Sequence, residues 1–181
     1  MSPGARWLPQ GVLAGARQVL SPNHDARPAG VRIDLLVVHN ISLPPGRFGG
    51  PEIEALFLNA LDCSRHPVFA ALRDLRVSSH FLIRRRGELI QFVPCDLRAW
   101  HAGVSSWAGR VRCNDFSIGV ELEGTDQRPY SAAQYRRLAR LTRALRERYP
   151  VADIVGHSDI APGRKTDPGL SFDWPQYRAL I

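Results

Sequence analysis

Runs of apolar residues along the chain predict several buried strands. Residues 33–39 (IDLLVVH) form a continuous apolar run rich in branched side chains, which is typical of a buried strand that ends at the histidine. Residues 81–83 and 89–93 flank a polar stretch that contains a glycine, and this pattern predicts a hairpin. Residues 116–122 (FSIGVEL) alternate in part and predict a further strand.

Helical periodicity separates these strands. Residues 51–61 (PEIEALFLNAL) predict a helix with proline in its first turn. Ser131 and Gln134 form a capping-box pattern, and the apolar residues behind them repeat at helical spacing between arginines. A short strand at 154–155 and a C-terminal helix from Pro175 follow. Because strands and helices are interspersed, we expect an α/β fold, a single domain with a central mixed β-sheet flanked by helices.

Length and composition agree with one compact domain. The chain has 181 residues, 44% of them hydrophobic, and shows no internal repeat or low-complexity tract. Its apolar runs are too short to cross a membrane as a helix. The N-terminal residues lack the sustained apolar region of a secretory signal, so we expect a cytoplasmic protein. Three widely spaced cysteines without a CxxC pair also favour a reducing compartment: Cys63, Cys95 and Cys113.

The net charge of the chain excludes few classes of binding partner. A net charge of +7 attracts anions, which include nucleic acid, anionic lipid and small carboxylate ligands. The densest basic runs, 84–86 and 136–148, are more typical of solvated faces than of binding stripes. Only one of the 24 basic residues is a lysine, Lys165. This points to a position where a compact, strongly hydrated ammonium is required, although chance would also produce it.

Three polar residues at the ends of predicted strands have the chemistry of zinc ligands. A catalytic zinc site needs three protein ligands and an open fourth position, and histidine and aspartate suit the ion. His39 ends the first strand, His157 follows the strand at 154–155, and Asp167 lies ten residues further on. Each also has a structural interpretation, as a hydrogen-bonded histidine or as the start of a turn before proline. Spacing alone leaves both interpretations open.

Several long segments resemble one family. LLVVHNISLPPGRFGG, RVSSHFLIRR, RAWHAGVSSW, RCNDFSIGVELEGTD and GHSDIAPGRKTDPGLSFDW resemble the 1,6-anhydro-N-acetylmuramyl-L-alanine amidases of Gram-negative bacteria, within the larger amidase and peptidoglycan-recognition-protein family. The resemblance runs from about Ser21 to the C-terminus, in the family's order. It implies that residues 21–181 are a zinc amidase domain and that residues 1–20 are an N-terminal extension of the same domain. It also implies helices on both faces of the sheet and one zinc ion in a surface cleft, held by His39, His157 and Asp167.

The resemblance further assigns two catalytic residues. Glu121 matches the family's glutamate, which would act as general base and then as general acid. Lys165 matches its catalytic lysine, which would stabilise the developing oxyanion. Glu123 lies on the same side of the strand as Glu121, and the residues themselves do not separate the two glutamates.

Substrate contacts are expected from three further residues. Arg76 and Arg112 match positions that hold the stem peptide, since arginine forks suit carboxylates, and Asn40 is a candidate partner for the substrate backbone. The segments 43–50 and 100–112 are expected to border the cleft and to move. Trp100, His101 and Trp107 would either stack on sugar or belong to the core. The histidines not needed as ligands are His101, His80 as a packed core residue, and His24 and His66 in loops.

The resemblance implies a zinc-dependent hydrolase that cuts the amide bond between (1,6-anhydro-)N-acetylmuramic acid and L-alanine of the stem peptide in recycled peptidoglycan. Its expected partner is the muropeptide substrate, with no nucleic acid, membrane or obligate protein partner. A non-catalytic peptidoglycan-binding module is the first alternative. The second is a basic nucleic-acid-binding protein, which would explain the charge but none of the motifs.

Overall fold

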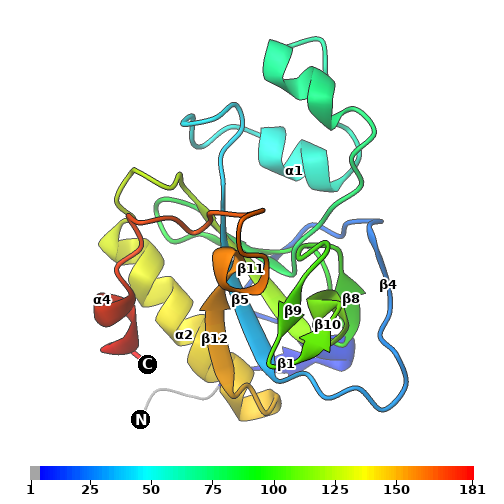
Figure 1. Cartoon of the computed structure of the whole chain (residues 1–181), viewed down its shortest axis with the longest axis vertical. Helices are drawn as coiled ribbons and strands as arrows, with labels where there is room; N and C mark the ends of the chain where they lie inside the picture. The colour runs from blue at the N-terminus through cyan, green and yellow to red at the C-terminus, as the bar shows by residue number, and fades with distance from the viewer. Residues whose placement is uncertain (1–4) are drawn as a thin grey trace.

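The computed structural model describes residues 5–181, and its main feature is a central six-stranded sheet (Figure 1). Its strand order is β12-β5-β11-β6-β7-β3. The first four strands run parallel, β7 is antiparallel to β6, and β3 is parallel to β7, so the predicted mixed sheet is confirmed. The strands span Asp153–Gly156 (β12), Leu35–Ile41 (β5), Ser117–Glu123 (β11), Phe81–Ile83 (β6), Leu89–Gln91 (β7) and Arg17–Gln18 (β3).

Helix α2 (Ala132–Arg148) covers one face of this sheet. It begins with the predicted capping box: the Ser131 hydroxyl accepts from the Gln134 N–H at 3.1 Å, and the Gln134 side chain accepts from the Ser131 N–H at 3.1 Å. Alternate residues of the central strands point at this helix, and the short C-terminal helix α4 (Trp174–Arg178) packs beside it. The buried residues at this interface include Leu36, Val38, Ile118, Val120, Leu122, Leu138, Leu141 and Leu145.

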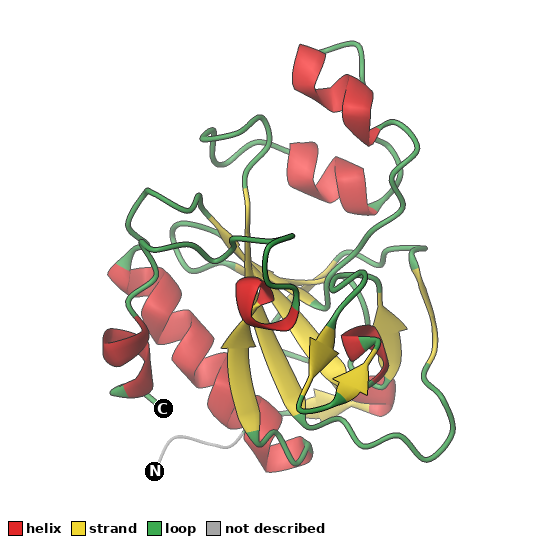
Figure 2. Ribbon diagram, in the orientation of Figure 1, coloured by secondary structure: helices red, strands yellow, loops and turns green. Residues whose placement is uncertain are grey.

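The other face is covered by shorter elements (Figure 2). Helix α1 (Glu52–Phe57) packs with β6 and β7, and α3 (His157–Ile160) packs against β5 with the segment 97–116. This segment contains β8 (Leu97–Ala99), β9 (Ser106–Trp107), β10 (Arg110–Val111) and the 3-10 turn η3 (Cys113–Asp115); η2 (Pro67–Leu72) follows α1 in the chain. Helices therefore lie on both faces, as the resemblance implied.

Several predicted boundaries differ from the structure by one or more residues, and two of these differences have a clear cause. The strand expected to end at His39 continues to Ile41, because parallel pairing with β11 extends in register to Ile41 and Glu123. The helix expected over 51–61 ends at Phe57, because Asn59 adopts a left-handed backbone with φ of 59°. The first difference comes from pairing with a neighbouring strand and the second from the local backbone conformation. Neither can be predicted from the periodicity of apolar residues.

The N-terminal segment forms small elements that the sequence did not predict. β1 (Trp7–Leu8) and β2 (Val12–Leu13) make a hairpin around η1 (Pro9–Gly11), and β4 (His24–Ala26) pairs with β8. The Trp7 ring packs edge-on against Tyr149, with centroids 6.0 Å apart. The Gln91 side chain accepts from the Leu13 N–H at 2.8 Å and donates to the Gly11 carbonyl at 2.9 Å. Among the helices of the described chain, none is long and apolar enough to span a membrane.

Candidate metal centre and its pocket

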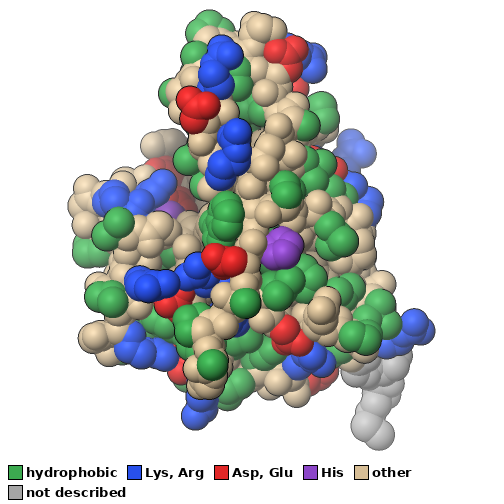
Figure 3. Space-filling model, turned by 90° about the vertical axis from the view of Figure 1, so that its right-hand side faces the viewer, with side chains coloured by type: hydrophobic (Ala, Val, Ile, Leu, Met, Phe, Trp, Pro, Cys, Tyr) green, Lys and Arg blue, Asp and Glu red, His purple; other side chains and the backbone are tan. Residues whose placement is uncertain are grey.

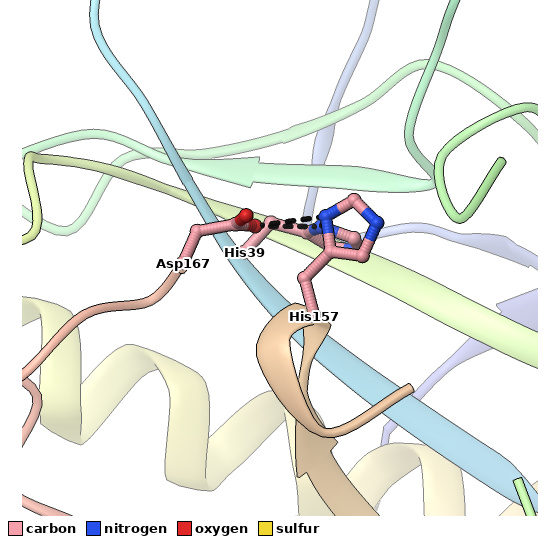
Figure 4. A group of neighbouring side chains, drawn as sticks. All are labelled: His39, His157 and Asp167. Atoms are coloured by element: carbon pink, nitrogen blue, oxygen red, sulfur yellow. Dashed lines mark hydrogen bonds and ion pairs between the residues drawn. The ribbon is translucent and has the colours of Figure 1, made fainter. Parts of the chain in front are cut away.

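Three candidate ligands meet at the carboxyl ends of two neighbouring strands. His39 lies on β5, and His157 is the first residue of α3, directly after β12. Because β12 pairs in parallel with β5, both histidines reach the same end of the sheet, and the loop after α3 returns Asp167 to them. The two Nδ1 atoms are 3.0 Å apart, and the Asp167 Oδ2 atom lies 3.1 Å from that of His39 and 3.0 Å from that of His157 (Figure 4).

This triangle has the dimensions and the donor chemistry of a metal site. Bonds of about 2.0–2.2 Å to a tetrahedral ion separate its ligands by roughly 3.3–3.6 Å, only slightly more than the distances found. The His157 Nε2 atom lies 3.1 Å from the Ala102 carbonyl, which only accepts, so Nε2 carries the proton of the neutral ring. The unprotonated Nδ1 then faces the Asp167 carboxylate at 3.0 Å, where two acceptors repel unless a cation lies between them. The donor set therefore fits a bound metal ion.

Burial and the contacts among these ligands together set their ionisation. It lowers the pKa of His39 to about 4, with His157 adding to the effect, so the imidazole is neutral at physiological pH. Burial opposes ionisation of Asp167, but its close contacts with His157 and His39 outweigh this effect and hold the pKa of the carboxyl well below its usual range. Imidazoles that bind a metal ion are neutral, so two of them and one carboxylate would carry a single negative charge and leave a bound divalent ion with net positive charge.

The two glutamates of β11 have different surroundings. Glu121 lies beside His39 in the strand register, and its Oε2 atom is buried with no hydrogen-bond partner in the described chain. Burial raises the pKa of Glu121 well above its ordinary value; Asp167 adds to this rise and Lys165 opposes it. Glu123 accepts from the Gly49 N–H at 2.7 Å, the Arg84 guanidinium at 2.8 Å and the Arg85 N–H at 3.1 Å. Glu123 therefore has a structural role, whereas Glu121 retains a carboxylate oxygen that is free to accept a hydrogen bond.

One pocket of about 260 Å³ contains the triad together with Glu121 and Lys165. Its polar groups converge at one end, and residues from α1, η2 and the segments beside them form an apolar wall. Trp100 and His101 also line the pocket. This shape suits a ligand with a polar reacting group attached to a less polar body. The apolar wall consists of Leu43, Leu56, Phe57, Leu72, Leu75 and Val77.

The three residues expected to bind substrate are distributed unevenly around this pocket. Asn40 lines it, but its amide also donates to Asp126 at 2.7 Å and to the Pro168 carbonyl at 3.1 Å. Arg76 is exposed beside lining residues and donates to the carbonyl of Arg73 at 3.2 Å. Arg112 is exposed and pairs with Asp115 at 3.3 Å. Neither arginine is among the described residues that line the pocket.

The sequence did not predict a set of hydrogen bonds that holds the loop carrying Asp167. We call this set the brace; its side chains are Asp126, Asn40, Thr166 and Tyr130. The Asp126 carboxylate accepts from the Asn40 amide at 2.7 Å and from the Thr166 hydroxyl at 2.6 Å. The Tyr130 hydroxyl donates to the Pro168 carbonyl at 2.7 Å. The only available signal was the position of Asp126 just beyond the end of a strand that carries a candidate catalytic residue.

The remaining aromatic candidates have mostly structural contacts. His80 is fully buried, as expected for a packed core residue, and burial lowers its pKa well below the ordinary value. The Trp107 indole donates to Asp153 at 2.8 Å. His66 accepts from the Val68 N–H at 3.3 Å at the start of η2, and His24 lies in β4. None of these four belongs to the metal triangle.

Comparison with known proteins shows which family the chain is similar to. Residues 29–170 match the N-acetylmuramoyl-L-alanine amidase family profile. The 1,6-anhydro-N-acetylmuramyl-L-alanine amidase AmpD of Citrobacter freundii is 61% identical over 176 residues, which cover 96% of this chain and 94% of the relative. A crystal structure of a selenomethionine AmpD derivative superposes with a TM-score of 0.94 and 61% identity, covering 97% of this chain and 99% of its own.

A more distant structure contains a ligand. The N-acetylmuramyl-L-alanine amidase AmiD from E. coli, in complex with the substrate anhydro-N-acetylmuramic acid-L-Ala-D-γ-Glu-L-Lys, has a TM-score of 0.61 and 32% identity. The match covers 85% of this chain and 60% of AmiD. Since the family profile spans most of the chain and the AmpD identity extends over nearly all of it, the chain belongs to the N-acetylmuramoyl-L-alanine amidase family.

Proposed function

We propose that this chain hydrolyses the amide bond between (1,6-anhydro-)N-acetylmuramic acid and the L-alanine of the stem peptide, in recycled peptidoglycan fragments. One zinc ion would be held by His39, His157 and Asp167. The observation that carries the proposal is the 3.0–3.1 Å triangle of two imidazole nitrogens and a carboxylate oxygen. The AmpD relative, named for this amide bond, and the substrate complex of AmiD support the same reaction class.

Zinc at this position would polarise the scissile carbonyl and lower the pKa of a bound water. Glu121 acts as the proton carrier: its free Oε2 atom takes a proton from the attacking water and returns it to the departing L-alanine amine. A C–O bond forms as the C–N bond breaks. Lys165 lines the same pocket and supplies positive charge to the developing oxyanion.

The substrate's sugar and peptide extend along the apolar wall and out of the pocket. Asn40 donates to the substrate backbone, and the guanidinium groups of Arg76 and Arg112 bind stem-peptide carboxylates. Arg76 is supported by its position between the lining residues Leu75 and Val77. For Arg112 the support is the sequence resemblance alone.

We also propose a cytoplasmic location and a single domain that includes residues 1–20. The free cysteines of the described chain, two of them buried, favour a reducing compartment. Basic side chains on the face in Figure 3 are interspersed with acidic and apolar ones rather than gathered in a stripe, which supports a muropeptide rather than nucleic acid as partner. Salt-dependent binding to DNA would contradict this assignment.

The decisive experiment incubates the purified protein with anhydromuramyl tripeptide and follows the products by mass spectrometry. Parallel samples receive a chelator and then zinc. We expect free tripeptide to be released, its release to stop with the chelator and to resume with zinc. Binding of the muropeptide without cleavage, in protein shown to contain zinc, would instead identify a recognition module and refute the roles of Glu121 and Lys165.

A further inference from the structure

Both metal histidines direct their second ring nitrogen at the same dipeptide, His101–Ala102. The His39 Nε2 atom lies 2.9 Å from the His101 Nδ1 atom. The His157 Nε2 atom lies 3.1 Å from the Ala102 carbonyl oxygen. The two histidines come from different elements, 118 residues apart, and this dipeptide contacts both.

The proton positions along this network follow from two carbonyl groups, those of Cys113 and Ala102. The Cys113 carbonyl only accepts, so the Ser117 hydroxyl donates to it at 2.6 Å. The Ser117 oxygen then accepts from the His101 Nε2–H at 3.1 Å, which leaves the His101 Nδ1 atom of the neutral ring unprotonated. That atom accepts from the His39 Nε2–H, and the His39 Nδ1 lone pair is left facing the triangle. The same reasoning from the Ala102 carbonyl leaves the His157 Nδ1 lone pair facing it.

The dipeptide is itself held firmly. The Asn114 side-chain oxygen accepts from the His101 N–H at 3.1 Å and from the Ala102 N–H at 2.8 Å. The His101 ring lies against Gly119, where an added Cβ would come within 2.5 Å of the ring Cγ atom. Its ring meets that of His39 edge-on, with centroids 5.0 Å apart. Neither the backbone nor the ring has room to turn.

We propose that the His101–Ala102 dipeptide is the positioning element of the metal centre, and that His101 is a positioning residue that presents the His39 Nδ1 atom to zinc. This inference rests on the zinc site of the proposed function and adds a role outside the three ligands. Partners of this kind fix the tautomer and orientation of a metal-bound histidine, and their loss weakens metal binding by about 10–100-fold.

His80 provides a control within the same row of rings. It is even more deeply buried than His101, and their ring centroids are 5.7 Å apart. Its Nδ1 atom accepts from the Gly119 N–H at 3.0 Å, and its Nε2 atom lies 3.1 Å from the Leu97 carbonyl. The Nε2 atom also lies 3.0 Å from the Arg27 Nη2 atom. None of these partners is a metal ligand, so removing the His80 ring perturbs the core without touching the triangle.

The test measures zinc affinity by competition with a chromophoric chelator, together with thermal unfolding of the metal-free protein. His101→Leu and His101→Asn have similar size, but only asparagine places an acceptor where the Nδ1 atom lies. We expect His101→Leu to weaken zinc binding by about 10–100-fold. His101→Asn should recover most of that loss, although both variants lower the unfolding temperature. Ser117→Ala should give a smaller loss, and His80→Leu should destabilise the metal-free protein without changing zinc affinity.

The outcomes distinguish this inference from the proposed function. If the unmodified protein does not bind zinc, the metal site itself is wrong. If it binds zinc and the leucine and asparagine variants have equal affinities, His101 does not act through its acceptor and the positioning role is refuted. An equal loss in His80→Leu would also refute it, because the effect would then be general damage to the core.

Discussion

At the scale of single residues, Glu121 and Glu123 show how the same side chain on the same face of β11 serves opposite purposes. Glu123 is surrounded by three donors within 3.1 Å, so its charge is compensated and it joins the 42–50 loop to the hairpin. Glu121 is also buried but keeps an oxygen without a hydrogen-bond partner in the described chain, beside the triad. An uncompensated buried carboxylate destabilises a fold, and such sites are common where a group must exchange protons.

Glu121→Gln should therefore lower the activity and raise the stability of the metal-free protein. We expect cleavage of anhydromuramyl tripeptide to fall by about 10²–10⁴-fold, because the proton carrier is lost. The raised pKa means that Glu121 stabilises the metal-free fold only while it is protonated, and this contribution is lost as pH rises through the folded-state pKa. The neutral amide should thus raise the unfolding temperature of metal-free protein at neutral pH, with a smaller gain in acid, as differential scanning calorimetry would measure.

Glu123→Gln is the matched control two residues away. It weakens the contacts to Arg84 and to the Gly49 N–H, so the unfolding temperature should fall while the chemical step persists. Equal loss of turnover in the two variants, at temperatures where both are folded, would argue against a separate role for Glu121.

Lys165 permits a second test at this scale. Lys165→Met should lower kcat by about 10²–10³-fold with zinc content unchanged, since it removes one oxyanion donor. Lys165→Arg should restore little of this activity, because a planar fork does not occupy the position of a compact ammonium. Full activity in the methionine variant would remove lysine from the mechanism and leave its rarity in the chain to chance.

At the scale of elements, the site depends on how β5, β12 and the 161–169 loop are joined. The parallel pairing of β12 with β5 is sufficient to place the two histidines at the same end of the sheet, whereas Asp167 lies on a loop. Asp126 holds that loop by accepting from both Asn40 and Thr166. The brace explains how a loop residue keeps its carboxylate within 3.1 Å of two imidazoles.

Asp126→Ala should loosen the Asp167 loop and weaken zinc binding in chelator competition. The loss of two exposed or half-buried hydrogen bonds is expected to cost only about 1–2 kcal/mol in unfolding free energy. Asn40→Ala separates the two roles considered for that residue: a brace predicts weaker zinc binding, whereas a substrate contact predicts a higher KM at unchanged zinc affinity. Unaltered zinc affinity in both variants would show that the loop holds its conformation without the brace.

At the scale of the whole molecule, the N-terminal segment contributes to the same core as the catalytic sheet. Leu13 and Ala16 are buried with the α2 cluster, and Gln91 bonds to both sides of the N-terminal hairpin. β3 also extends the edge of the sheet beyond β7. None of the described residues of this segment lines the pocket that contains the triad, so its contribution is to the stability of the fold.

Deletion of residues 1–20 should therefore destabilise the whole domain. Loss of a buried leucine alone costs about 2–5 kcal/mol, so a drop of at least this size is expected in urea unfolding. The transition should remain a single cooperative one, monitored in parallel by tryptophan fluorescence and circular dichroism. A truncated protein with unchanged stability would show that residues 1–20 are an appendage and not part of the domain.

The sequence by itself determined the central strands, α2 with its capping box, and the three ligand candidates, because each depends on local periodicity or on residues at strand ends. The resemblance of its motifs to the amidase family indicated which reaction to expect. Tertiary structure alone decided which glutamate keeps a free oxygen, where His101, Ala102 and Asp126 lie, and how the short N-terminal strands attach to the sheet. Those features depend on single hydrogen bonds such as those between residues 38 to 128 positions apart, which leave no repeating pattern along the chain.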